Sequence, residues 1–331
     1  MSGPAWGLKG LERRLRYFFR PTARLTKQVQ NLNSKLGPEK VRNLLAEPLV
    51  RQIRTLPPST PLEEAEFSVY SQWGEDGIIQ FLLAHVPCPN RTFVEFGVED
   101  FSEANLRFLI ERSPWRGLVM DGRPDLEALI QATGLAWRRH IQAKSVFITA
   151  ENINGLVRPS IVEPELDILS IDLDGVDYWV WKAFSAYSPR IVIAEYNSLF
   201  GPSATITVPY QPDFQRAKEH HSHLYFGASL GALITLAQKK GYSCVGSTST
   251  GVNAFFVRND VRGRLPSLTS EQAWRDLCVR ESRNPEGKMS YISGSDRVKA
   301  IEHLPAVDVR TGQTAPIRTF MAAGPKESTS L

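Results

Sequence analysis

The sequence contains few cysteines and no long apolar run. Its three cysteines, Cys88, Cys244 and Cys278, are too few and too scattered among 331 residues to form a disulfide framework, and no Cys-x-x-Cys spacing occurs. This argues against a structural zinc site and favours a reducing compartment. No apolar run is long enough to span a bilayer, and the N-terminus lacks the apolar core of a signal peptide. We therefore expect a cytoplasmic protein without a transmembrane segment.

A large excess of one charge sign is also missing. With 39 Lys and Arg against 35 Asp and Glu, the formal net charge is only +4, so no nucleic-acid partner is expected. Most of the excess lies within residues 1–36, where basic residues are interspersed with Trp, Leu and Phe in a pattern that favours an amphipathic helix. Two roles stay open for this basic helix. In the first, the helix would pack on the main domain or on a second subunit and so mediate oligomerisation. In the second, it would make peripheral contact with an anionic membrane.

Proline marks one boundary along the chain. Pro57, Pro58 and Pro61 lie close together and are typical of a linker. We expect a basic helical N-terminal extension and linker over residues 1–66, an α/β domain over residues 67–260, and a C-terminal extension over residues 261–331. Within this extension, a helix is predicted over residues 270–281 and disorder over residues 322–331.

Four apolar runs, near residues 94, 119, 169 and 192, each end in acidic residues. Short runs that are apolar throughout are typical of parallel strands buried on both faces. In such sheets, ligands bind outside the carboxyl ends of the strands. The acids at these ends are Glu95, Asp121, Asp172, Asp174 and Glu195. The sequence therefore predicts a Rossmann-like sheet with carboxylates gathered at one edge.

The first two of these acids have the spacing expected of a nucleoside site. The separation of Glu95 and Asp121 along the chain is the one over which such folds place a carboxylate beside a ribose. A carboxylate can accept hydrogen bonds from both ribose hydroxyls. The loop after Gly97 has a single glycine and carries Glu99 and Asp100, which would repel a pyrophosphate. A nucleoside without phosphates is therefore a better fit than a dinucleotide.

The order of these motifs resembles that of the FkbM-like class I methyltransferases, which use S-adenosylmethionine. The resemblance lies in Glu95-Phe-Gly97, Met120-Asp121-Gly-Arg-Pro124, Ile171-Asp-Leu-Asp-Gly175 and Pro189-Arg-Ile-Val-Ile-Ala-Glu195, and it extends over residues 67–260. It implies an α/β, Rossmann-like class I methyltransferase sheet, mostly parallel, with a C-terminal antiparallel hairpin and flanking helices. The implied activity is methyl transfer to a hydroxyl of a small molecule or a sugar.

The resemblance also assigns residues. Gln72, Glu95, Gly97, Asp121 and Asp172 would bind the cofactor. Asp174 and Glu195 would orient or deprotonate the acceptor. The loop after Gly97 departs from the family, because Glu99 and Asp100 stand where the family usually has a small residue, Asn and a second Gly. Such an acidic loop would pair with the ammonium group of the cofactor.

The acids also resemble a magnesium site of the kind found in catechol-type O-methyltransferases. Asp172, Asp174, Glu195 and Asn197 offer the oxygen ligands that hard divalent cations prefer. A metal there would lower the pKa of a substrate oxygen. Without a metal, crowded carboxylates raise one another's pKa, and one of them serves as general base. Both interpretations stay open, whereas Asp177 is interpreted as an acid at the start of a helix.

Histidines form one dense group, His220, His221 and His223. They are candidate ligands of a transition metal or a general base, and we place His223 in the catalytic set. The alternative is a polar loop that covers the active site. Two further hypotheses remain: a metal-dependent enzyme that no longer uses S-adenosylmethionine, and a non-catalytic scaffold that docks through its basic helix.

Overall fold

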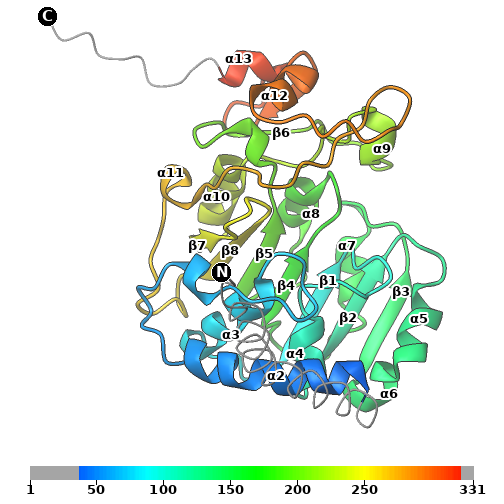
Figure 1. Ribbon diagram of the computed structural model, residues 1–331, viewed down its shortest axis with the longest axis vertical. Coiled ribbons are helices and arrows are strands. Elements are labelled where there is room, and N and C mark those ends of the chain that lie inside the picture. The colour runs from blue at the N-terminus through cyan, green and yellow to red at the C-terminus, as the bar shows by residue number, and fades with distance from the viewer. Residues whose placement is uncertain (1–36, 322–331) are drawn as a thin grey trace, which may run out of the picture. The chain divides into compact units, whose positions relative to one another are not determined.

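The computed structural model describes residues 37–321 (Figure 1). The basic helix predicted within residues 1–36 and the disorder predicted for residues 322–331 lie outside the described residues. The chain divides into two compact units, residues 1–50 and 51–331. The sheets and the site residues all belong to the second unit. The predicted division near residue 66 stays a prediction.

The main sheet has seven strands in the order β3-β2-β1-β4-β5-β8-β7. Strands β1 to β5 pair in parallel, whereas β8 is antiparallel to both β5 and β7. The predicted mostly parallel, Rossmann-like sheet with a C-terminal antiparallel hairpin is therefore confirmed. The strands are β1 (Thr92–Phe96), β2 (Arg116–Asp121), β3 (Ile141–Ser145), β4 (Ile168–Ile171), β5 (Ile191–Glu195), β7 (Tyr242–Ser247) and β8 (Asn253–Arg258).

Helices cover both faces of this sheet (Figure 1). They are α3 (Glu75–His85), α4 (Arg107–Arg112), α5 (Leu126–Thr133), α6 (Leu135–Arg139), α7 (Ile153–Val157), α8 (Asp177–Ala183) and α10 (Leu230–Lys239). Successive side chains of a strand point to opposite faces, so each face builds its own core. In β4, Leu169 and Ile171 join one apolar cluster with α7, α8 and α10, while Ile168 joins a second with α3, α4 and α5. Burial on both faces explains why the central strands β1, β4 and β5 are largely apolar, whereas the edge strand β3 is more polar.

Shorter elements connect these layers. They are the 3₁₀ helices η1 (Leu62–Ala65) and η2 (Ser198–Phe200), and the single helical turns α9 (Arg216–Glu219) and α11 (Ser270–Ala273). A second, antiparallel sheet has the order β10-β9-β6. It joins β6 (Ile206–Thr207) to β9 (Pro305–Asp308) and β10 (Thr314–Pro316), with α12 (Ser295–Ile301) and α13 (Ile317–Met321) nearby in sequence. The C-terminal extension thus pairs with a segment that follows β5.

The helix predicted over residues 270–281 is wrong beyond its first turn. α11 ends at Ala273, and Trp274 is extended, with its indole Nε1 donating to the Ser198 carbonyl at 3.0 Å. The chain then runs without helix through Glu281, and the buried Arg297 of α12 donates to the carbonyls of Leu277 and Val279 at 2.8 and 3.1 Å. Residues 277–281 are called the strap below.

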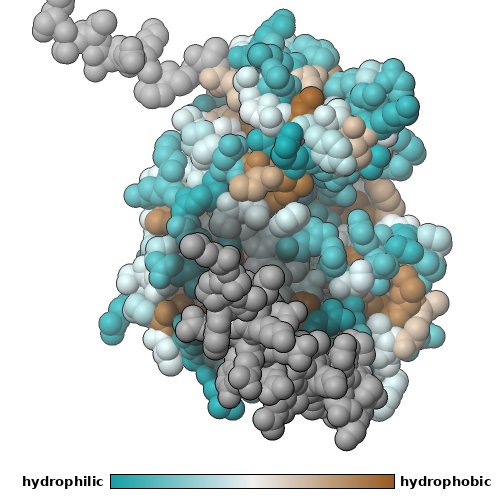
Figure 2. All heavy atoms as spheres, viewed as in Figure 1, coloured by the Kyte–Doolittle hydropathy of each residue, from teal (hydrophilic) through white to brown (hydrophobic). Residues whose placement is uncertain are grey.

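None of the helices within residues 37–321 is both long and apolar enough to cross a membrane. The face shown in Figure 2 is mainly hydrophilic, with apolar side chains in small separate groups.

Candidate active site

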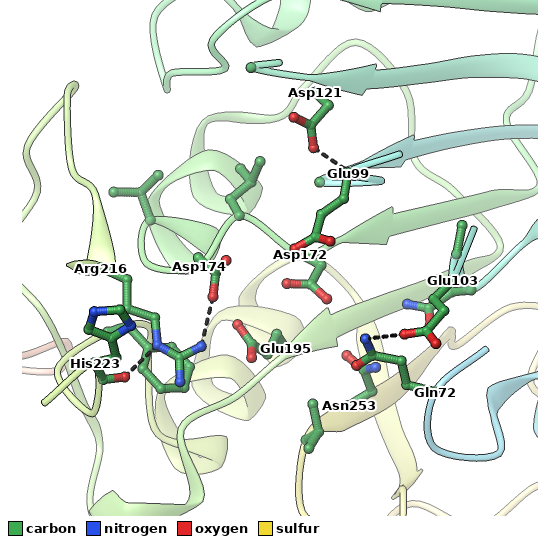
Figure 3. A pocket seen from close by; sticks show the side chains of 18 of the residues that line it. Gln72, Glu99, Glu103, Asp121, Asp172, Asp174, Glu195, Arg216, His223 and Asn253 are labelled. Carbon is green, nitrogen blue, oxygen red and sulfur yellow. Dashed lines mark hydrogen bonds and ion pairs between the residues drawn. The ribbon is translucent and has the colours of Figure 1, made fainter. Parts of the chain in front are cut away.

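A cavity of about 580 Å³ lies at the carboxyl ends of β1, β2, β4 and β5. This volume is within the range of sites for small molecules and cofactors. Of the residues predicted for the site, Asn197, His220 and His221 do not line it, and the others do: Gln72, Glu95, Gly97, Asp121, Asp172, Asp174, Glu195 and His223. Figure 3 shows Asp121, Glu99 and Gln72 on one side, Arg216, Asp174 and His223 on the other, and Asp172 with Glu195 between them. We call these two sides the Asp121 end and the Arg216 end.

Gly97 lets two strand ends approach closely. It has a φ of +69°, and a Cβ atom there would lie 1.4 Å from the carbonyl oxygen of Asp172. Only glycine adopts this conformation readily and leaves room for that carbonyl. The glycine after β1 is therefore what permits Asp172, after β4, to stand beside it.

The carboxylate of Asp121 is held by two backbone amides. Its Oδ2 accepts a hydrogen bond from the Glu99 amide and its Oδ1 from the Arg123 amide, both at 2.8 Å. Each oxygen keeps a second lone pair for a ligand. The side-chain amide of Gln72 at this end donates to Glu103 at 2.7 Å.

Glu95 is turned toward the start of α4. Its two oxygens accept hydrogen bonds from the Leu106 amide at 3.2 and 3.3 Å, and the residue is 2% exposed. Burial raises the pKa of Glu95 to about 8. Glu95 thus supports the cavity wall as a largely neutral acid.

Two carboxylates that line the cavity, Asp172 and Glu195, form a group with Asp177, which does not line it. Asp172, Asp177 and Glu195 each have an oxygen within 4.8 Å of the others. Burial, followed by the charges of neighbouring carboxylates, raises the pKa of both Asp172 and Glu195 well above their usual values. Within residues 37–321, the buried Oε2 of Glu195 has no hydrogen-bond partner. A proton on this oxygen, a bound cation or a hydrogen-bond donor of a ligand would provide the missing partner.

Asp177 has a structural role in this group. Its oxygens accept hydrogen bonds from the amides of Leu173 and Gly175 at 2.8 and 3.1 Å, which fixes the turn between β4 and α8. This agrees with its interpretation as an acid at a helix start, although it is buried rather than solvated.

Arg216 is a functional candidate that sequence reasoning missed. Its Nη1 donates to Asp174 Oδ1 at 2.8 Å, its Nε donates to the carbonyl of His223, and its guanidinium lies 3.9 Å from the centre of the Phe226 ring. Asp174 has a φ of +52°, which aspartate tolerates better than most residues. Arg216 thereby brings a positive charge to the carboxylates. Nothing in the local sequence signals this, since α9 is a single turn in an irregular segment.

The amide of Asn197 is used within the fold. Its Oδ1 accepts from the Leu199 amide at 3.1 Å, and its Nδ2 donates to the carbonyls of Leu224 and Phe226, both at 3.0 Å. We therefore leave Asn197 out of the ligand set proposed below.

The histidines do not converge on one point. The Nδ1 of His220 lies 2.7 Å from Ser222 Oγ, and the centre of its ring lies 4.2 Å from that of His221, with the two planes tilted by 39°. Among the described residues, the His, Cys, Asp and Glu side chains close enough to share a metal ion are Asp172, Asp177 and Glu195. His223 alone of the three lines the cavity, and burial followed by the charges of Arg283 and Arg216 lowers its pKa.

The cavity also contains an amide that the sequence did not reveal. Asn253 begins β8 and pairs with Glu195 in the sheet, and its Nδ2 donates to Glu75 Oε1 at 2.8 Å. Its Oδ1 is buried without a partner among the described residues. Because β8 runs antiparallel to β5, the start of β8 lies beside the end of β5. An antiparallel strand after β5 was predicted, but not which of its residues would face the site.

No protein-family model matches this sequence, and no curated protein matches it. Solved structures do. The N-terminal domain of EvdMO1 with SAH bound is 10% identical, with 63% of this chain and 94% of that chain covered and a TM-score of 0.36. The O-methyltransferase from Bacillus cereus in complex with SAH is 13% identical (69% and 94% covered, TM-score 0.34), and an O-methyltransferase family protein from Burkholderia thailandensis is 12% identical (81% and 71%, TM-score 0.32). The fold of this chain follows from its own strand order, β3-β2-β1-β4-β5-β8-β7.

Proposed function

We propose that this protein is an S-adenosylmethionine-dependent methyltransferase that acts on a hydroxyl of a small molecule or a sugar. The observation that carries the proposal is the division of one cavity between a backbone-fixed Asp121 at one end and buried, protonatable carboxylates in the middle. The first suits a ribose, and the second suits the loss of a proton from an acceptor. The more specific assignment to the FkbM-like family remains a proposal from the sequence motifs.

The residues of the cavity fit this cofactor better than a dinucleotide. S-adenosylmethionine carries a sulfonium and an ammonium cation and a ribose with two hydroxyl donors, and it lacks phosphates. Apart from Glu95, Asp172 and Glu195, whose pKa values burial raises, five acids line the cavity within the described residues, against one arginine, Arg216, and no lysine. These five are Glu99, Glu103, Asp121, Asp174 and Glu281. A pyrophosphate would be repelled there. Asp121 would hold the ribose, while Gln72, Glu95, Gly97 and Asp172 would complete the wall around the rest of the cofactor.

When bound, this cofactor would supply an electrophilic methyl group. The contribution of the chain is then to orient the acceptor hydroxyl and to accept its proton. Burial raises the pKa of Glu195 well above its usual value, which makes its carboxylate a stronger base than an exposed one. We assign proton acceptance to Glu195, and placement of the acceptor to Asp174 and to the imidazole of His223.

A second candidate function is a metal-dependent reaction on the same fold, without S-adenosylmethionine. The orphan Glu195 Oε2 and the proximity of Asp172 and Asp177 favour it. Asp172 and Glu195 would bind a divalent cation such as Mg²⁺, while Asp174, also predicted as a ligand, pairs with Arg216. The cation would relieve the repulsion among the acids and increase the acidity of a bound hydroxyl.

Calorimetric titration separates the two. We expect S-adenosylmethionine to bind with and without Mg²⁺, and Asp121→Asn to weaken binding roughly 10- to 100-fold, the loss expected for a hydrogen bond to a charged group. The matched control is Asp125→Asn, since Asp125 is an exposed acid paired with Arg123 outside the cavity. Absence of binding under both conditions contradicts the first function. The second function is supported if metal stays bound to the protein after desalting and is absent from the Asp172→Ala/Glu195→Ala variant.

The cytoplasmic location and the partner role of residues 1–36 stay proposals that rest on the sequence alone.

A further inference from the structure

The strap gives the cavity a wall that the core α/β domain does not provide. Leu277, Val279 and Glu281 line the cavity, whereas Cys278 and Arg280 do not. Exposure alternates in the same way over the first four of these residues, since Leu277 and Val279 are half-buried and Cys278 and Arg280 are exposed, whereas Glu281 lines the cavity and is exposed. In an extended chain, successive side chains point to opposite sides, so every second residue is covered when one side of the chain faces a surface.

The strap is held in this register from two sides. Arg297, 4% exposed, donates to the carbonyls of Leu277 and Val279, two residues apart, which point the same way in an extended chain. On the other side, the Cys278 amide donates to the carbonyl of Thr250, in the turn between β7 and β8, at 3.1 Å. These bonds orient the side chains of Leu277 and Val279.

The last residue of the strap, Glu281, lies at the Arg216 end of the cavity. Glu281 is within electrostatic reach of both Arg216 and His223. It also pairs with Arg283 at 3.5 Å, in a largely solvated contact. Because Asp121 marks the opposite end, this part of the strap borders the space left for the acceptor under the proposed function.

The unsatisfied groups of the cavity wall are hydrogen-bond acceptors when Glu195 is ionised, as its assigned role of proton acceptor requires. Among the described residues, the two buried side-chain atoms of the wall without a partner are Glu195 Oε2 and Asn253 Oδ1. A ligand that satisfies them must bring donors, as hydroxyl and amine groups do, whereas phosphate and carboxylate groups bring only acceptors. The excess of carboxylates over the single arginine also disfavours anionic ligands.

We propose that the strap is the outer wall of an acceptor subsite, and that this subsite admits neutral or amine-bearing hydroxyl compounds while it excludes phosphorylated and carboxylated ones. This inference names the substrate class for the proposed methyl transfer and rests on that function.

Charged thiol reagents test it without knowledge of the acceptor. The Val279→Cys variant, in a Cys278→Ser background, is treated with a cationic reagent, 2-(trimethylammonium)ethyl methanethiosulfonate, or an anionic one, 2-sulfonatoethyl methanethiosulfonate. The rate of modification of each cysteine is measured from the masses of the peptides. The matched controls are native Cys278 in the otherwise unchanged chain and free 2-mercaptoethanol. We expect the ratio of cationic to anionic rates at position 279 to exceed that at Cys278 by at least about tenfold, as in clefts of one charge sign. The excess should vanish near 1 M salt, where the screening length is about 3 Å. A ratio equal to that of Cys278, or in favour of the anion, overturns the proposal.

S-adenosylhomocysteine provides the second measurement. After modification of Val279→Cys, its dissociation constant should stay within about twofold of that of the unmodified protein, as expected for sites that do not touch. Loss of its binding on modification would place the strap at the cofactor end and refute its assignment to the acceptor. If the unmodified protein does not bind S-adenosylhomocysteine, the proposed function fails, while the ratio of rates still reports the charge selectivity of the wall.

Discussion

Replacement of Gly97 by alanine tests how β1 and β4 build the site. Two costs add at this position. A φ of +69° disfavours alanine by about 1–2 kcal/mol. The new Cβ atom would also meet the Asp172 carbonyl at 1.4 Å, a backbone atom that no side-chain rotation can move. Overpacking of this kind adds about 1–3 kcal/mol. We therefore expect Gly97→Ala to lower the free energy of unfolding by about 2–5 kcal/mol.

Two other glycines separate these costs. Gly241 has a φ of +86°, but a Cβ atom added there would meet no described atom within 4 Å, so Gly241→Ala should show only the first cost, about 1–2 kcal/mol. Gly155 lies inside α7 with open space and no positive φ, so Gly155→Ala should stabilise by about 0.5–1 kcal/mol. Urea unfolding measures all three through the midpoint at constant slope. The reasoning is refuted if Gly97→Ala loses no more stability than Gly241→Ala.

Three further predictions concern residues around the cavity. Because the pKa of Glu95 in the folded state, about 8, lies above its ordinary value of 4.5, the protein should lose unfolding free energy as the pH rises between these values. Urea midpoints across this range should fall less for Glu95→Gln, and an equal fall would show that Glu95 is not the group responsible. Asn197→Ala removes three buried hydrogen bonds and should cost about 2–4 kcal/mol in urea unfolding, yet leave any metal content of the desalted protein unchanged; loss of metal would restore Asn197 as a ligand. Arg297→Met should free the strap and speed tryptic cleavage after Arg280, whereas an unchanged rate would show that Arg297 does not hold it.

The sequence predicted the sheet and most of the cavity wall because both depend on local pattern. An apolar run that ends in Asp172 or Glu195 indicates both a strand and the point where it ends, and parallel pairing then brings those ends to one edge. Asp121 followed from its spacing to Glu95. These inferences need no knowledge of how distant segments meet.

The remainder of the site depends on contacts between distant segments. Arg216 reaches Asp174 across 42 positions of the chain, and only the folded irregular segment brings them together. The amide of Asn197 looked available in the sequence, but carbonyls 27 and 29 residues away occupy it. The spacing of Leu277 favoured a helix, yet the side chain of Arg297 satisfies its carbonyl in an extended chain.

The turn between β7 and β8 carries a constraint on how this chain can vary. Hairpin turns at the surface ordinarily tolerate insertions and deletions. Here the carbonyl of Thr250 holds the strap through the Cys278 amide, Val252 lines the cavity, and the next residue, Asn253, pairs with Glu195. One added residue would shift the strap relative to the strand that bears Glu195. The length of this turn therefore helps to set the shape of the site. A related protein with a longer turn should differ in the molecules it accepts.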